Sequence, residues 1–155
     1  MDKSILKLPS LTILSALALR IINNNLIAQM VKDTNEWTIE MGNRLLLIDV
    51  ILSLVIFFII GITLRKTQDK SMILKSATLL VFYSIAILIL EQVTQYYGIY
   101  NFSIALILYL PTELFTIITS LISNISPSES INIFFAIPAL FAPYLFIPFG
   151  KNKHS

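Results

Sequence analysis

LLLIDVILSLVIFFIIGITL, residues 45–64, is the stretch that decides the fold class of this chain. Twenty residues in a helix, at about 1.5 Å each, match the thickness of ~30 Å that the hydrocarbon core of a bilayer has. Asp49 is the only charged residue in the stretch. The sequence therefore predicts a membrane-spanning helix here.

Four further apolar runs surround this one, at residues 8–28, 72–97, 102–122 and 131–149. Hydrophobic residues make up 56% of the 155 residues and charged residues only 13%, whereas a soluble domain has about 25% charged residues. The chain lacks the polar residues that a water-facing surface needs. We predict an all-α, polytopic integral membrane protein, with residues 1–155 forming a single transmembrane domain, a small helical bundle.

The first run resembles a signal peptide in layout, because Lys3 and Lys7 precede a short apolar core. A cleavage site of small residues does not follow; Arg20 and the three asparagines at 23–25 come instead. These residues favour an uncleaved helix.

The last two runs contain residues that disturb helices. Pro111 and Glu113 interrupt the fourth run, and the fifth carries Pro138, Pro143 and Pro148. Proline removes a backbone donor and clashes with the preceding turn, so a break or kink is expected in each run. Both runs are long enough to span, and five crossings are the main expectation. The alternative is four crossings, with one of these runs entering the bilayer and returning.

Basic residues in short loops predict the orientation, because they concentrate on the cytoplasmic side. The N-terminus and the 65–75 connector carry six basic residues and lie on one side if the first two runs cross. We expect that side to be cytoplasmic. A composition rich in Ile and Asn, with more Lys than Arg, indicates the plasma membrane of a low-GC bacterium. Five crossings would place Lys151 and Lys153 outside, against the charge rule. Four crossings would return them to the cytoplasmic side.

Four charged residues lie within the runs: Arg20, Asp49, Glu91 and Glu113. Charged groups in hydrocarbon need shelter or a partner. Arg20, Asp49 and Glu91 fall in the outer half of the membrane, so we expect Arg20 to pair with Asp49, Glu91 or both. A ligand or ion site is one alternative, and side chains that extend to the interface without partners are another.

Glu113 is the first candidate for function, because it lies near the middle of its run, two positions after Pro111. The helix should bend or break there and leave carbonyl groups free to meet an ion or water. A carboxylate at that depth either has a partner or stays protonated, so both a structural hydrogen bond and a titrating site remain open. Polar residues share helix faces in three runs, which predicts interhelical hydrogen bonds or a polar pathway: Asp49, Ser53 and Thr63; Ser84, Glu91 and Gln95; Thr112, Thr116, Thr119 and Ser123.

Several chemistries are excluded by composition. The chain has no cysteine, and its single histidine is His154 in the tail. A haem or zinc site held by histidines in the membrane, or a Ser–His dyad, is therefore impossible. Only one aspartate lies in a run, although an aspartyl intramembrane protease needs two. We expect no metal, no cofactor and no catalytic residues, and the scattered basic residues give no support to nucleic-acid binding.

The sequence holds no motif specific enough to name a family. These features predict a small multi-pass membrane protein without catalytic apparatus. It would act as an accessory, immunity-type or regulatory partner of a membrane complex, with the lipid bilayer and either a membrane-protein partner or further copies of itself around it. The alternative is a proton- or ion-coupled transporter or channel subunit that uses intramembrane acids. A weaker alternative is a membrane-embedded lipid-modifying enzyme based on Glu91 and Glu113.

Overall fold

Helices make up all the named elements of the computed structural model, which describes residues 3–32, 36–125 and 137–152. Three helices are long and apolar enough to cross a membrane, and α4 with α5 forms a fourth, bent candidate. The prediction of an all-α membrane bundle is confirmed. In chain order the elements are η1 (Lys3–Leu6), α1 (Lys7–Val31), α2 (Ile39–Thr67), α3 (Lys70–Tyr96), α4 (Phe102–Leu108), η2 (Leu110–Thr112), α5 (Glu113–Ile125), α6 (Ile137–Phe141) and η4 (Ala142–Phe149).

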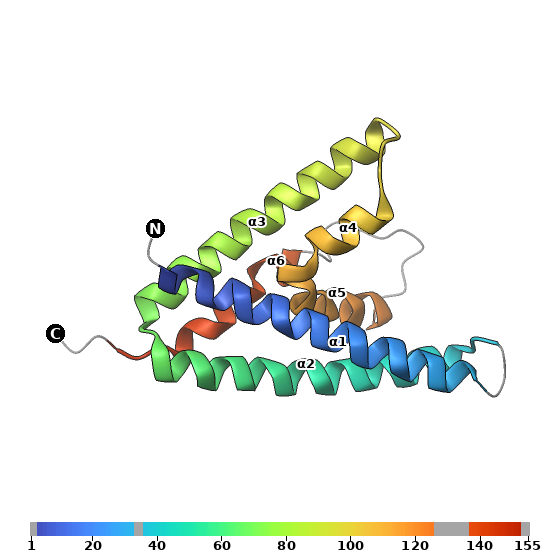
Figure 1. Ribbon diagram of the computed structural model, residues 1–155, viewed down its shortest axis with the longest axis horizontal. Helices are drawn as coiled ribbons and strands as arrows, with labels where there is room; N and C mark the ends of the chain where they lie inside the picture. Colours follow the sequence, from blue (N-terminus) through green and yellow to red (C-terminus); the bar gives the residue numbers. More distant parts are fainter. Residues whose placement is uncertain (1–2, 33–35, 126–136, 153–155) are drawn as a thin grey trace.

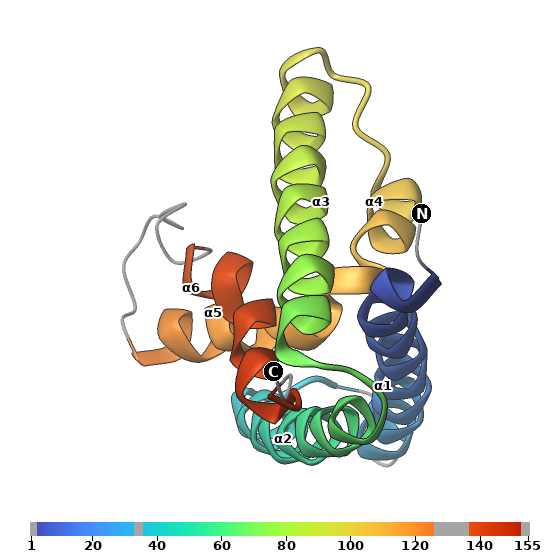
Figure 2. The same ribbon diagram turned by 90° about the vertical axis from the view of Figure 1, so that its left-hand side faces the viewer.

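α1 and α2 lie side by side and antiparallel along the long axis of the molecule, and α3 rises from them at an angle (Figures 1 and 2). Side-chain caps define where α2 and α3 begin. The Thr38 hydroxyl accepts a hydrogen bond of 3.2 Å from the Met41 amide at the start of α2. Asp69 does the same for Met72 at 2.9 Å, at the start of α3. Because these caps satisfy amides that a helix start leaves free, two residues suffice to turn the chain between α2 and α3.

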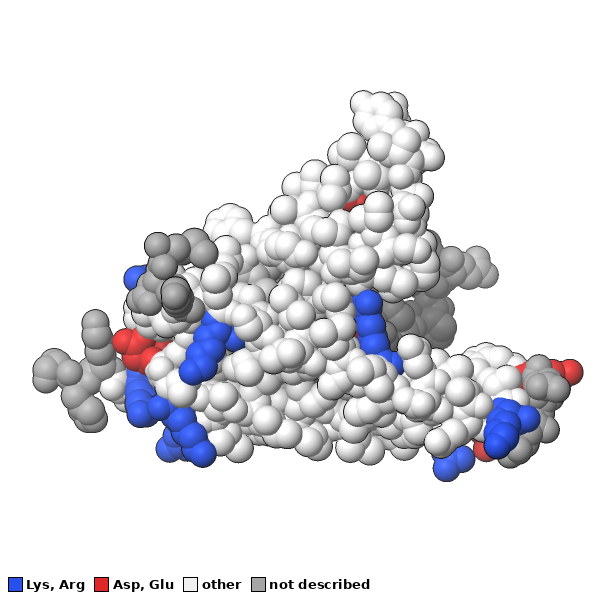
Figure 3. Space-filling view, in the orientation of Figure 1, with Lys and Arg blue, Asp and Glu red and all other residues white. Residues whose placement is uncertain are grey.

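Both ends of the described chain meet the α2–α3 turn. The Gln68 side chain donates to the Ser4 carbonyl, and the Ser76 hydroxyl donates to the Ile5 carbonyl at 2.6 Å. The Lys70 amide donates to the Lys151 carbonyl at 3.0 Å. We call this part of the molecule the basic end, because most basic side chains gather there (Figure 3, left); they are Lys7, Arg65, Lys66, Lys70, Lys75 and Lys151.

The position of the tail bears on the number of crossings. α3 ends at the opposite end of the molecule from Lys151 (Figure 1), and Lys151 bonds to the α2–α3 turn, so the tail lies at the end of the molecule where α3 begins. The described residues hold three helices long enough to span and one bent pair that can count as a fourth span, so the structure agrees better with the four-crossing alternative than with five crossings. The physical reason is that the last two runs are not straight. The chain bends by 47° between α4 and α5, and the fifth run ends in the short helices α6 and η4. Residues 131–136 of that run lie outside the described residues.

The C-terminal segment fills the centre of the bundle. Phe146 in η4 is completely buried, stacked on Phe57 of α2 with ring centroids 4.4 Å apart and edge-on to Phe115 of α5 at 6.2 Å. A Cβ atom at Gly61 would lie 2.6 Å from the ring of Phe149, so glycine lets that ring approach α2 closely. The core therefore joins elements from both halves of the chain; its buried members are Leu8, Leu19, Ile60, Leu64, Ile73, Ala77, Leu80, Leu114, Phe115, Ala142 and Phe146.

The fold predicts that Gln68 and Asn152 lie on the same side of the membrane. Topology reporters fused after each residue should give the same compartment, and a cysteine that replaces Asn35, which lies outside the described residues, should be labelled from the other side. Opposite compartments for the two fusions would support five crossings and contradict the docked tail.

Gly150→Ala should loosen the tail. A Cβ atom at this position would lie 2.6 Å from the Lys70 backbone nitrogen and 2.7 Å from its Cα, and backbone atoms cannot move aside. The φ of −65° suits any residue, so the cost is steric, on the order of 1–3 kcal/mol for overpacking. Thermal unfolding in detergent should occur at a lower temperature. Gly42→Ala is the control, because its Cβ would make an ordinary contact of 3.7 Å with Trp37. Equal melting temperatures for both variants would contradict the close approach.

Candidate functional site

The fourth apolar run breaks at Pro111, as the sequence predicts. α4 ends at Leu108, and the chain passes through η2 into α5, which begins with Glu113. Proline has no amide hydrogen, and its ring clashes with the carbonyl four residues earlier, here that of Ile107. Glu113 therefore lies directly beyond a break within the bundle.

Side chains from other helices meet the carbonyl groups at the break. The Arg20 Nη2 of α1 donates to the Leu106 carbonyl at 2.6 Å, and the Tyr83 hydroxyl of α3 donates to the Leu108 carbonyl at 2.7 Å. These carbonyls lie in the last turn of α4, where no helical amide is left to bond them. The sequence predicts free carbonyls for an ion or water, but protein donors bind these two.

Arg20 also forms an ion pair with Glu113. Its Nε donates to Oε1 at 2.8 Å, and its Nη2 lies 2.6 Å from Oε2. The side chains are 27% and 23% exposed, so the pair is largely sheltered. The planar guanidinium is suited to this arrangement, because its five donors in a fork can serve a carboxylate and a carbonyl together. One side chain thus neutralises the acid and caps the broken helix.

The expected pairing of Arg20 with Asp49 or Glu91 is wrong, because Glu113 takes that place. Depth in the membrane gives the height of a residue but not the side of the bundle that it faces. The break brings η2 and α5 against α1, so the nearest carboxylate comes from the fourth run. Arg20 therefore does not pair with the acids expected at its depth, and it does have a partner.

Asp49 takes part in the contact between α1 and α2. The Asn23 side chain of α1 lies near its carboxylate. Oδ1 of each residue is buried and has no hydrogen-bond partner within residues 3–32, 36–125 and 137–152. The neighbour of Asp49 across this contact is therefore an uncharged amide.

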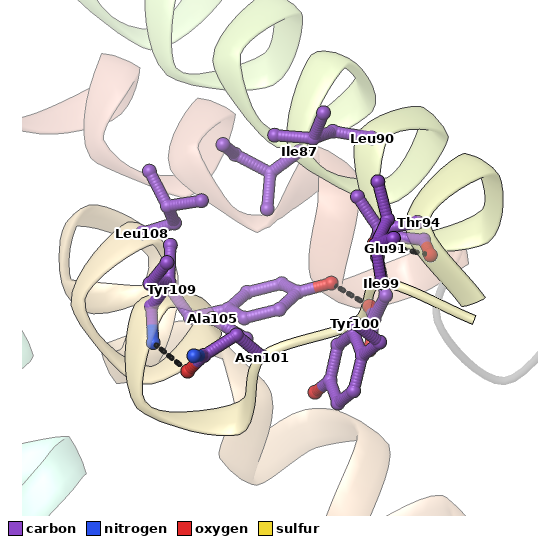
Figure 4. A pocket seen from close by; sticks show the side chains of 11 residues that line it. Ile87, Leu90, Glu91, Thr94, Ile99, Tyr100, Asn101, Ala105, Leu108 and Tyr109 are labelled. Carbon is purple, nitrogen blue, oxygen red and sulfur yellow. Dashed lines mark hydrogen bonds between the residues drawn. The ribbon is translucent and has the colours of Figure 1, made fainter. Parts of the chain in front are cut away.

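Glu91 lines a separate pocket in the half of the molecule away from the basic end (Figure 4). The Tyr109 ring crosses this pocket, and its hydroxyl donates to Glu91 Oε2; the Gln95 amide donates to Oε1 at 3.2 Å. The cavity measures about 80 Å³. Sequence patterns miss Tyr109, although its place two residues before Pro111 could have indicated it. The pocket is lined by Ile87, Leu90, Glu91, Thr94, Ile99, Tyr100, Asn101, Ile104, Ala105, Leu108 and Tyr109.

Three threonines of the predicted polar face, but not Ser123, line a second cavity of about 80 Å³ together with Ser84 and Tyr109; they are Thr112, Thr116 and Thr119. Hydroxyl groups of this face bond locally: Thr112 donates to the Tyr109 carbonyl at 3.1 Å and Thr116 to the Glu113 carbonyl at 2.7 Å. Ser84 likewise donates to Leu80 on its own helix at 2.8 Å. These hydroxyls therefore cap local backbone and do not join helices to one another.

The described residues contain no group of three or more His, Asp or Glu side chains that could hold a metal ion. No protein-family model, no curated protein and no solved structure matches the chain.

We predict that Arg20→Leu is more damaging alone than together with Glu113→Leu. The single change leaves a sheltered carboxylate and the Leu106 carbonyl without their partner. Removal of one partner from a buried pair costs on the order of 3 kcal/mol. The double change leaves only the carbonyl unbonded. Folded yield and melting temperature in detergent measure the difference.

Arg20→Leu with Asp49→Asn is the matched control, and it should be no better than Arg20→Leu alone. Rescue by Asp49→Asn and none by Glu113→Leu would contradict the observed ion pair.

Proposed function

We propose that this chain is a subunit without catalytic apparatus, acting as an accessory, immunity-type or regulatory partner of a larger membrane complex. The observation that supports this proposal is the state of the intramembrane charges. Arg20 and Glu113 neutralise each other and hold the break, and Glu91 is bound by Tyr109. Charged groups that are paired in this way stabilise the fold, and they are poorly placed to react with a substrate or to bind an ion.

The proposed location is the plasma membrane of a bacterium, with the basic end in the cytoplasm. Basic side chains of α1, α2, α3 and the tail share that end. The opposite ends of α1 and α2 mix Lys32 and Arg44 with Glu36 and Glu40. An excess of Lys and Arg on one side supports this orientation, and the docked tail removes the conflict that five crossings would create.

Proton- or ion-coupled transport is a second candidate, and the position of Tyr109 favours it. This residue lines both 80 Å³ cavities, one with Glu91 and the other with Thr112, Thr116 and Thr119. An intramembrane acid that opens into a pocket is a common feature of proton pathways. In such a pathway the Tyr109 side chain would have to move to join the cavities.

The lipid-modifying enzyme has weaker support. Its two candidate acids have different partners, since Glu113 pairs with Arg20 and Glu91 accepts from Tyr109. A reaction that uses both carboxylates on one substrate would require both contacts to break.

Purification from the native membrane and reconstitution separate these functions. The accessory role predicts a second protein in fixed stoichiometry by native mass spectrometry, and no proton flux when the chain alone is placed in liposomes. Proton or solute flux by the chain alone would contradict it and favour transport.

Transport through the Glu91 pocket carries its own requirement, which is that Glu91→Gln abolishes any such flux. Glu40→Gln is the matched control, because that acid lies in the first turn of α2, outside the apolar run. Flux that survives Glu91→Gln would exclude this pocket as the pathway.

A further inference from the structure

A crevice of about 530 Å³ opens at the basic end and is lined by cations from three segments. Arg65 comes from the end of α2, Lys70 is the first residue of α3, and Lys151 belongs to the tail. Asn152 adds an amide, and the remaining wall is Pro148, Phe149 and Gly150. The described residues that line it include no acid, so the crevice concentrates positive charge.

Backbone hydrogen bonds hold this arrangement in place. The Lys70 amide donates to the Lys151 carbonyl at 3.0 Å, and the Lys151 amide donates to the Gln68 carbonyl at 3.2 Å. Gly150 lies so close to Lys70 that no side chain fits between them. Asp69 is the neighbouring acid, and its carboxylate accepts from the Met72 amide as the cap of α3. The crevice is therefore a product of the docked tail.

The crevice lies at the surface of the membrane. Arg65 directly follows the apolar run 45–64, which places it at the depth of the lipid headgroups. Phe149 and Pro148 form an apolar wall beside the cations, and such a wall suits the glycerol and upper acyl carbons of a lipid. A free inorganic anion has no apolar part that could contact this wall.

We propose that the crevice binds the headgroup phosphate of an anionic phospholipid in the leaflet at the basic end. A guanidinium can bind two phosphate oxygens at once, and two ammonium groups add point charges. Basic pockets between membrane helices are a recognised type of site for anionic headgroups. The inference is independent of the accessory role, because it rests on the tail and the α2–α3 turn alone.

Lipid binding can be measured by native mass spectrometry in a neutral detergent, with phosphatidylglycerol compared with phosphatidylcholine. The chain should prefer phosphatidylglycerol. Arg65→Gln, Lys70→Gln and Lys151→Gln together should weaken that binding on the order of 100-fold, since each basic residue near an anionic surface contributes about a factor of five.

The matched control removes three charges at the same end but outside the crevice, with Lys7→Gln, Lys66→Gln and Lys75→Gln. It should keep most of the affinity. An equal loss in the control would overturn the proposal, because it would show attraction by net charge without a site.

Gly150→Ala is the second variant, and it keeps every charge while it displaces the tail. It should weaken phosphatidylglycerol binding. Because it keeps every charge, this variant tests the proposal even where the triple crevice variant fails to fold. Unchanged affinity would overturn the proposal. Inorganic phosphate at millimolar concentration should not displace the lipid. Full displacement would assign the crevice to a free phosphate instead.

Discussion

The carbonyl groups at the end of α4 impose the constraint on which the rest of this bundle depends, because hydrocarbon offers them no water. Arg20 bonds one of them and Tyr83 another. An arginine at that depth needs a counter-charge, and Glu113, the first residue beyond the break, supplies it. The proline, the arginine and the acid therefore form one unit that joins α1, α3 and the fourth run.

The same unit explains how the C-terminal part is placed. A fourth run that bends at Pro111 leaves the remaining chain to return to the basic end. Phe146 fills the middle of the bundle on that return, and Lys151 reaches the α2–α3 turn. The docked tail agrees with the distribution of basic residues, so the charge pattern and the core packing favour the same four-crossing arrangement.

Much of the fold follows from hydrophobic pattern and helix signals. The bounds of the runs 45–64 and 72–97 differ by one to six residues from those of α2 (Ile39–Thr67) and α3 (Lys70–Tyr96), and Pro111 marks the break because its effect on a helix is local. The partner of Arg20 does not follow, since residue spacing fixes depth but not direction. Tyr83, in the middle of α3, and Tyr109, directly after α4, escape notice for a related reason: the sequence does not show which acceptor a tyrosine hydroxyl meets. The close approach at Gly150 involves segments about 80 residues apart, which no local pattern records.

The central claim is that the Arg20 guanidinium contacts the Glu113 carboxylate inside the membrane. Solid-state NMR tests it directly, by dipolar dephasing between ¹⁵N-labelled arginine side chains and ¹³Cδ-labelled glutamate in lipid bilayers. Arg44→Lys in the sample removes the arginine that lies one helical turn from Glu40. Strong dephasing that disappears when Glu113→Gln is added is the predicted result. Absence of dephasing in the Arg44→Lys chain, or dephasing that persists after Glu113→Gln, would contradict the ion pair and the capped break that depends on it.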